Sequence, residues 1–308
     1  MAVVSANGIE IAYDERGKPD NPAIVLIIGL GTQMIAWPEE FCDGLAARGF
    51  RVVRFDNRDI GLSTKLEGGR PVNLTTLFLR AFIGLPVRSP YTLNDMARDA
   101  VGLMDRLGID RAHVVGASMG GMIGQIVAAE HPSRVRSLVS IMSTSGARGL
   151  PSAKSEAMAA LRKPRPDARD REAAIQHGMY VYRAIGSPGF AAPEAELRQK
   201  VERAFDRSYY PAGVGRQLAA IVANGSRVEL LKRITAPTLV IHGADDPLVP
   251  LAAGKDTAAR IRGAHLEVIP GMGHDLPTAL VPRLVQSIAA HCEAADGRPV
   301  QGAAAAHG

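Results

Sequence analysis

Residues 116–120 read Gly-Ala-Ser-Met-Gly, the pattern G-x-S-x-G with Ser118 at its centre. They follow a short apolar stretch and precede a helix-like segment, so we expect a sharp strand-to-helix turn with the serine at its tip. Small residues at Gly116 and Gly120 suit such a turn because the backbone passes close to itself. The helix N-terminus behind the serine would stabilise negative charge that develops nearby. The pattern therefore favours a serine nucleophile over a structural serine at a glycine-rich helix start.

A serine hydroxyl is a weak nucleophile unless a base takes its proton, and that base needs an acid to orient it. Two later segments carry such side chains. Residues 242–250, His-Gly-Ala-Asp-Asp-Pro-Leu-Val-Pro, offer Asp245 and Asp246 directly after an expected strand. Residues 271–275, Gly-Met-Gly-His-Asp, offer His274 after another expected strand. Because the carboxyl ends of parallel strands open at one edge of a sheet, we expect these loops to meet the serine there.

The elements that must position these loops alternate between strand and helix. The continuous apolar run at 23–28 suits a parallel strand buried on both faces, and Asn7-Gly8 predicts a hairpin turn. Eight strands are expected, over 3–4, 9–13, 23–28, 51–55, 113–116, 135–141, 237–241 and 265–269. Helical patterns lie between them, over 37–48, 93–107 and 119–131. This alternation predicts an α/β protein with a mostly parallel, eight-stranded sheet flanked by helices.

The alternation breaks at two places. Residues 74–87 form an apolar insertion, and residues 148–232 hold helix-like stretches without a strong strand. These stretches cover 155–161, 171–185, 193–207 and 214–222, and four tyrosines there, Tyr180, Tyr182, Tyr209 and Tyr210, either line an acyl pocket or pack the helices. We therefore predict a core over 1–147 and 233–292, a helical cap over 148–232 and a flexible tail over 293–308.

Over about residues 1–290 these motifs resemble those of α/β-hydrolase-fold serine hydrolases. The resemblance rests on G-A-S-M-G-G, H-G-A-D-D-P-L-V-P, G-M-G-H and, at 56–63, D-N-R-D-I-G-L-S. It implies a catalytic triad of Ser118, His274 and Asp246, because the acid in this family usually occupies the last position of H-G-x-x-D. Asp245 is the alternative acid; its structural interpretation is a turn residue that hydrogen-bonds its own loop.

The loop after the strand at 23–28 departs from the family. It reads I-I-G-L-G-T-Q-M-I-A-W-P, with Ile28 where a histidine is common, and this variant is similar to the aclacinomycin methylesterase-like branch. The resemblance implies an oxyanion hole formed by the backbone N–H groups of Leu30 and Met119. Trp37, near this loop, either lines a pocket or anchors its helix.

Two further sets of polar residues have structural interpretations. In the loop at 56–63, Asp59 replaces the usual glycine, and we expect Asp56 and Arg58 to fix a turn beside the site. His242 lies inside a strand, where a hydrogen-bonded core histidine is the better interpretation than a catalyst.

The expected reaction is hydrolysis of a carboxylic ester through an acyl-enzyme. The same triad could instead cleave a C–C bond or a thioester, or add peroxide to the acyl-enzyme as a cofactor-free perhydrolase. A different class is a non-catalytic hydrolase fold that only binds a ligand. Because the cap and the insertion are apolar, the expected partner is a small-molecule ester with an apolar acyl or aromatic group.

Several other classes are excluded. The 36 Lys and Arg against 31 Asp and Glu are scattered, which predicts no nucleic-acid partner and no membrane surface. No metal and no cofactor is expected, since metal-ligand spacing, a P-loop and a dinucleotide fingerprint are absent from the sequence. Cys42 and Cys292 are expected as reduced thiols, with one bridge as the alternative. Without a signal-peptide pattern or a membrane-length apolar run, a cytoplasmic protein is expected; oligomeric state has no signature in the sequence.

Overall fold

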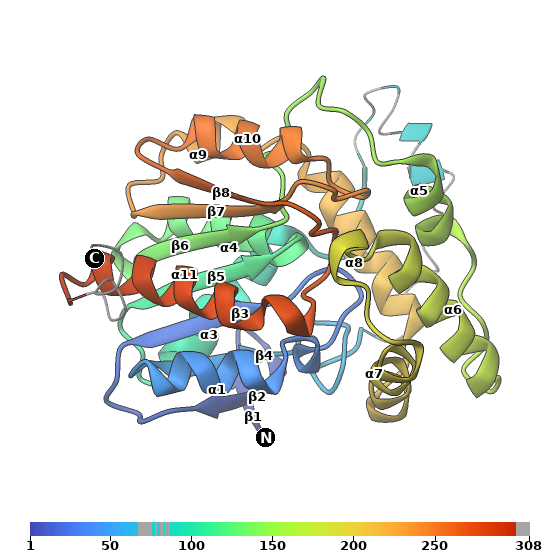
Figure 1. Cartoon of the computed structure of the whole chain (residues 1–308), viewed down its shortest axis with the longest axis horizontal. Helices are drawn as coiled ribbons and strands as arrows, with labels where there is room; N and C mark the ends of the chain where they lie inside the picture. The colour runs from blue at the N-terminus through green and yellow to red at the C-terminus, as the bar shows by residue number, and fades with distance from the viewer. Residues whose placement is uncertain (67–75, 78, 81–82, 84, 86, 300–308) are drawn as a thin grey trace, which may run out of the picture.

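A single eight-stranded sheet organises the chain (Figure 1). The computed structural model describes residues 1–66, 76–77, 79–80, 83, 85 and 87–299. The strands are β1 (Ala2–Ala6), β2 (Ile9–Arg16), β3 (Ala23–Ile27), β4 (Arg51–Phe55), β5 (Ala112–Ala117), β6 (Val135–Ile141), β7 (Thr238–Gly243) and β8 (His265–Ile269). Their order is β1-β2-β4-β3-β5-β6-β7-β8, and every neighbouring pair from β4 to β8 is parallel. The predicted eight-stranded, mostly parallel sheet is confirmed.

The two N-terminal strands form the expected hairpin. Asn7 and Gly8 both have positive φ, 48° and 77°, as a two-residue turn between twisted antiparallel strands requires. Ala6 pairs with Ile9 directly beside this turn. β2 then pairs antiparallel with β4, which attaches the hairpin to the edge of the parallel sheet.

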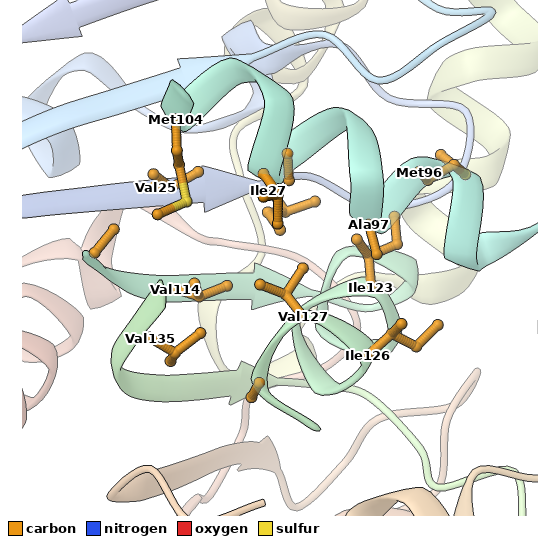
Figure 2. Close-up of a cluster of buried hydrophobic side chains, with 14 of the residues drawn as sticks. Val25, Ile27, Met96, Ala97, Met104, Val114, Ile123, Ile126, Val127 and Val135 are labelled. Carbon is orange, nitrogen blue, oxygen red and sulfur yellow. The ribbon is translucent and has the colours of Figure 1, made fainter. Parts of the chain in front are cut away.

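Helices cover both faces of the sheet (Figure 1). Helices α1 (Glu39–Ala47) and α11 (Val281–Ala295) cover one face, and α3 (Leu93–Arg106) and α4 (Met119–Glu130) cover the other. Helix α10 (Leu251–Arg260) packs against β7. Figure 2 shows apolar side chains of α3 and α4 meeting those of β3, β5 and β6. None of the helices in the described part of the chain is both long and apolar enough to cross a bilayer.

Five helices connect β6 to β7. They are α5 (Ser155–Arg162), α6 (Arg171–Ile185), α7 (Glu194–Arg207), α8 (Pro211–Asn224) and α9 (Val228–Leu231). In Figure 1, α5 to α8 lie beside the carboxyl ends of the central strands. The four expected helical stretches correspond to α5–α8, whereas the one-turn α9 was too short for its periodicity to be recognised. The division into core and cap stays a prediction.

The described chain continues in helical form beyond residue 292, where a tail was expected to begin. α11 ends at Ala295, and the buried Glu293 forms an ion pair with Arg48 at 2.8 Å. Small residues made this helix end resemble a flexible segment. Most of the insertion at 74–87, and residues 300–308 of the expected tail, lie outside the described residues.

Both cysteines are free and buried in the core between the sheet, α1 and α11. Burial raises the pKa of the Cys42 thiol and of the Cys292 thiol to about 12, because a thiolate would lose its hydration there. The expectation of two unpaired thiols therefore agrees with the structure.

Helix α3 begins with a reciprocal cap that provides a test of the fold. The Thr92 side chain accepts a hydrogen bond from the Asp95 N–H at 3.1 Å, and the Asp95 carboxylate accepts one from the Thr92 N–H at 2.8 Å. Because Thr92 is exposed, Thr92→Ala should lower the free energy of unfolding by about 1 kcal/mol through loss of the cap alone. Thr92→Ser keeps the capping oxygen and is the control in urea denaturation; equal stability of all three proteins would contradict the prediction.

Candidate active site

Ser118 occupies the turn between β5 and α4 in an unfavourable backbone conformation. Its φ is 55° and its ψ is −117°, a region that costs a non-glycine residue about 1–3 kcal/mol. Its N–H donates to the Ile141 carbonyl of the neighbouring strand at 2.9 Å. Glycines are required on both sides of it: a Cβ on Gly116 would lie 2.1 Å from the Gly120 oxygen, and one on Gly120 would lie 1.9 Å from the Ile27 oxygen. The expected sharp turn is therefore present.

The three side chains that the sequence motifs singled out lie in one hydrogen-bonded line. His274 Nε2 lies 2.9 Å from Ser118 Oγ, and His274 Nδ1 lies 2.7 Å from Asp246 Oδ2. The Asp246 side chain is 0% exposed and the His274 side chain 6% exposed, so water competes little for either group. A carboxylate on Nδ1 favours the tautomer in which Nε2 can accept the serine proton.

Asp246 is oriented by its own loop. Its Oδ1 accepts the N–H groups of Leu248 and Val249 at 2.9 and 2.8 Å, which leaves Oδ2 for His274. His242 Nε2 donates to the Val249 carbonyl at 2.7 Å and lies 3.6 Å from Asp246 Oδ2. The His242 ring is buried, as expected of a core histidine, and burial lowers its pKa. It supports the loop that presents the carboxylate.

Asp245, the alternative acid, is directed elsewhere. It is exposed, and its Oδ2 accepts the N–H of Gly271 at 2.8 Å. That bond ties the loop after β7 to the loop that carries His274. The geometry therefore agrees with the structural interpretation of Asp245 and favours Asp246 as the partner of the imidazole.

The loop that carries His274 is fastened to the turn after α6. The His274 N–H donates to the Ile185 carbonyl at 2.7 Å, and the Gly273 N–H donates to Ser187 Oγ at 2.8 Å. The Ser187 hydroxyl in turn donates to Asp275, whose pKa is raised because the carboxyl group is largely buried. Ser187 lies in no recognisable motif, and only the fold brings it to this loop.

Two backbone amides beside the nucleophile are the expected oxyanion donors. A Cβ on Gly29 would lie 3.2 Å from Ser118 Cβ, so Gly29 packs closely beside Ser118. Leu30 directly follows Gly29 in the chain, and Met119 directly follows Ser118. Within the described residues, neither the Leu30 nor the Met119 amide donates a hydrogen bond to a protein acceptor. The next amide, that of Gly31, is occupied by Gln217 Oε1 at 2.9 Å.

The loop at 56–63 contacts the loop after β3, and Asp56 fixes its conformation. Asp56 Oδ1 accepts the Met34 N–H at 2.7 Å, and Oδ2 accepts the Leu62 N–H at 2.9 Å. Arg207 of α7 approaches the same carboxylate at 2.7 Å. Asp56 thus fixes the turn, as expected, and also ties it to the loop after β3.

The other two charged residues of this loop bind neighbouring helices. Asp59 has a φ of 68°, the conformation that suits the family's usual glycine, and forms two hydrogen bonds with Arg216 of α8 at 2.8 and 2.9 Å. Arg58 pairs with Asp99 of α3, with both hydrogen bonds at 2.6 Å. Arg58 was expected to fix the turn itself, but its long side chain reaches α3 instead.

The aromatic residues near the site pack against other side chains or hydrogen-bond to backbone carbonyls. Trp37 is fully buried and stacks on Phe41 with ring centroids 5.2 Å apart. The hydroxyl of Tyr209 donates to the Pro166 carbonyl at 2.9 Å, and that of Tyr210 donates to the Leu66 carbonyl at 3.1 Å. Tyr182 packs on the small apolar cluster between α6 and α7, and Tyr180 is exposed.

Comparison with known proteins identifies the family. The α/β hydrolase fold family matches residues 22–277, which is most of the chain. Rhodomycin D methylesterase DnrP of Streptomyces peucetius is 28% identical over 301 residues, covering 91% of this chain and 93% of the relative. The bifunctional esterase/perhydrolase DCH of Acinetobacter calcoaceticus is 26% identical over 291 residues, covering 90% and 93%. The chain belongs to the α/β hydrolase family, and the expected similarity to methylesterases is confirmed.

Two solved structures agree on the fold. The enol-lactonase from Burkholderia xenovorans superimposes with a TM-score of 0.72 at 22% identity, covering 94% of this chain and 99% of that one. The meta-cleavage product hydrolase from Pseudomonas fluorescens superimposes with a TM-score of 0.74 at 20% identity, covering 96% and 98%. The expected α/β hydrolase fold is confirmed.

The two adjacent aspartates allow a sharp comparison. Asp246→Asn keeps the side-chain shape but removes the charge that faces His274, and it should lower kcat for an ester substrate by about 10⁴-fold. Asp245→Asn removes only an exposed loop contact and should leave kcat near that of the wild type. Steady-state kinetics on both variants checks this, and the opposite ranking would make Asp245 the acid.

Proposed function

We propose that this α/β hydrolase cleaves carboxylic esters through an acyl-enzyme formed on Ser118. The observation that carries the proposal is the hydrogen-bonded line from Ser118 Oγ through the His274 ring to Asp246. Nucleophile, base and orienting acid are each within hydrogen-bond reach, which is the arrangement that activates a serine. The named methylesterase and esterase relatives support the ester as the bond that is attacked.

Each residue has one task in the first half of the reaction. His274 Nε2 takes the hydroxyl proton as Ser118 Oγ attacks the ester carbonyl. The carbonyl oxygen becomes an oxyanion, which the N–H groups of Leu30 and Met119 stabilise, and Asp246 stabilises the imidazolium. The tetrahedral intermediate then collapses, and His274 gives its proton to the alcohol that leaves.

The second half repeats these steps with water. His274 takes a proton from a water molecule, which attacks the acyl group on Ser118. The same two amides stabilise the second oxyanion, and His274 returns the proton to the serine as the carboxylic acid leaves. Over one cycle the ester and one water molecule are converted to the alcohol and the carboxylic acid, and the free enzyme is regenerated.

We further propose a small-molecule ester with an apolar acyl or aromatic group. Leu30 lies on the edge of the apolar core beside the nucleophile, and a Cβ placed on Gly31 would lie 3.0 Å from Val214 Cγ1 of α8. Apolar side chains therefore border the oxyanion loop from the core and from the helices between β6 and β7. Such surroundings favour hydrocarbon over a strongly hydrated group beside the reacting carbonyl.

Removing the nucleophile is the direct test of this function. Ser118→Ala should fold as the wild type does but lose about 10⁴–10⁶-fold in ester turnover, because acyl transfer has no alternative acceptor there. Ser155→Ala, at the exposed start of α5, is the matched control and should keep full activity. A panel of p-nitrophenyl esters, acyl-CoA thioesters and β-diketones measures the preference; wild-type turnover in Ser118→Ala would contradict the proposal.

The dependence on pH tests the base separately. Histidine side chains ordinarily titrate near pH ~6.5, and only the neutral imidazole can accept the serine proton. With a histidine base, kcat/KM should fall as the pH is lowered into the acidic range, because protonation of the imidazole removes the proton acceptor. The profile is measured with a neutral ester at constant ionic strength, and a flat profile down to pH ~5 would count against a histidine base.

A further inference from the structure

Arg165, in the segment between α5 and α6, carries a positive charge with which none of the described carboxylates forms an ion pair. Within the described residues it forms no ion pair and donates no hydrogen bond, and the groups that act on its charge are Tyr209 and Tyr182. Neighbouring arginines behave differently, since each pairs with a carboxylate: Arg169 with Asp167, Arg171 with Asp206, Arg198 with Glu172, Arg207 with Asp56 and Arg216 with Asp59. Arg165 differs from these five arginines, and it also differs from Arg227, whose guanidinium donates to amide and carbonyl oxygens instead.

The guanidinium of Arg165 reaches the loop that holds the proposed oxyanion donors. A Cβ placed on Gly31 would lie 3.4 Å from Arg165 Nη2. Gly31 directly follows Leu30, so its Cα lies at most about 7 Å from that of Gly29, the residue beside Ser118. The free charge thus lies within the length of a small ester molecule from Ser118.

The Arg165 side chain is exposed, so a ligand in solution can reach its charge. The adjacent Pro166 is held by its carbonyl, which accepts the Tyr209 hydroxyl at 2.9 Å. The charge is thus held near the site by a fixed segment of backbone.

A buried imidazole nitrogen without a hydrogen-bond partner among the described residues lies near Arg165. His177 of α6 is 6% exposed, and its Nδ1 has no hydrogen-bond partner in the described part of the chain. Burial lowers the pKa of this imidazole, and the positive charges of Arg165 and Lys163 lower it further. A buried polar atom without a partner is costly. An anionic ligand would compensate the cation, and it could also accept a hydrogen bond from the imidazole.

We propose that Arg165 binds a carboxylate on the substrate, at the end remote from the ester bond that Ser118 attacks. The substrate class is then an ester with an apolar body and a distal carboxylate, such as a half-ester of a dicarboxylic acid. This assignment rests on the proposed function, because the reactive serine defines where the ester bond lies. The planar guanidinium can donate two parallel hydrogen bonds to a carboxylate, which makes arginine suited to this recognition.

Matched substrates test the assignment. One pair is the mono-p-nitrophenyl ester of adipic acid and the same ester with its free carboxylate replaced by a neutral primary amide. In this pair the charge lies on the acyl side. The other is 4-carboxyphenyl and 4-carbamoylphenyl hexanoate, with the charge on the alcohol side. In one of the two pairs, wild-type kcat/KM should favour the carboxylate by about 10–100-fold, as expected for a hydrogen bond between charged groups.

The variants separate recognition from chemistry. Arg165→Gln should abolish that preference while leaving turnover of the neutral esters unchanged, and Arg165→Lys should keep part of it. Arg169→Gln, which removes an exposed arginine from the same segment, is the control and should behave as the wild type does. Equal rates within both pairs for the wild type, or an undiminished preference in Arg165→Gln, would overturn the assignment.

A binding measurement keeps this result separate from the proposed function. Adipate is titrated calorimetrically into Ser118→Ala and into the double variant Ser118→Ala with Arg165→Gln, so that no turnover is needed. Weaker binding by the double variant, by about 10-fold or more, supports the anion site even if no ester is hydrolysed. Absent binding in the single variant, or equal binding by the two proteins, overturns it.

Discussion

The backbone turn at Ser118 is the constraint around which the rest of the structure is arranged. A serine at a φ of 55° is retained only where its surroundings determine the conformation, and here a strand, a helix and two glycines do so. The same close approach of α4 to the end of β3 places the Gly29–Gly31 loop against the nucleophile. The turn at Ser118 therefore positions its hydroxyl and, beside it, the backbone amides of Leu30 and Met119.

The remaining groups of the site are held by contacts between distant segments. Asp246 is oriented by backbone amides of its own loop, but the loop of His274 depends on Ile185 and Ser187 from the turn after α6. The region between β6 and β7 thus supports the loop of His274, and in the proposed function it also borders the substrate. The same region forms ion pairs with the loop that follows β4, because Arg207 and Arg216 bind carboxylates of residues 56–63.

Local signals made much of this architecture predictable. Apolar strand runs, the Asn7-Gly8 turn and the motif around Ser118 each act over a few residues, and the structure agrees with them. Contacts that depend on long side chains or on folding between segments were not predictable. The pairing of Arg58 with Asp99 and the support of His274 by Ser187 join residues with no shared sequence pattern. The lack of an ion pair at Arg165 within the described residues likewise follows only from the positions of the carboxylates around it.

The central claim is that the imidazole of His274 makes the Ser118 hydroxyl a nucleophile. Labelling with a fluorophosphonate, followed by mass spectrometry of the intact protein and of its peptides, tests this most directly because the reagent traps an activated serine. We expect one phosphonyl group per chain, located on Ser118, with loss of ester turnover in proportion to labelling. A label on another residue, or turnover that persists in fully labelled protein, would contradict the account.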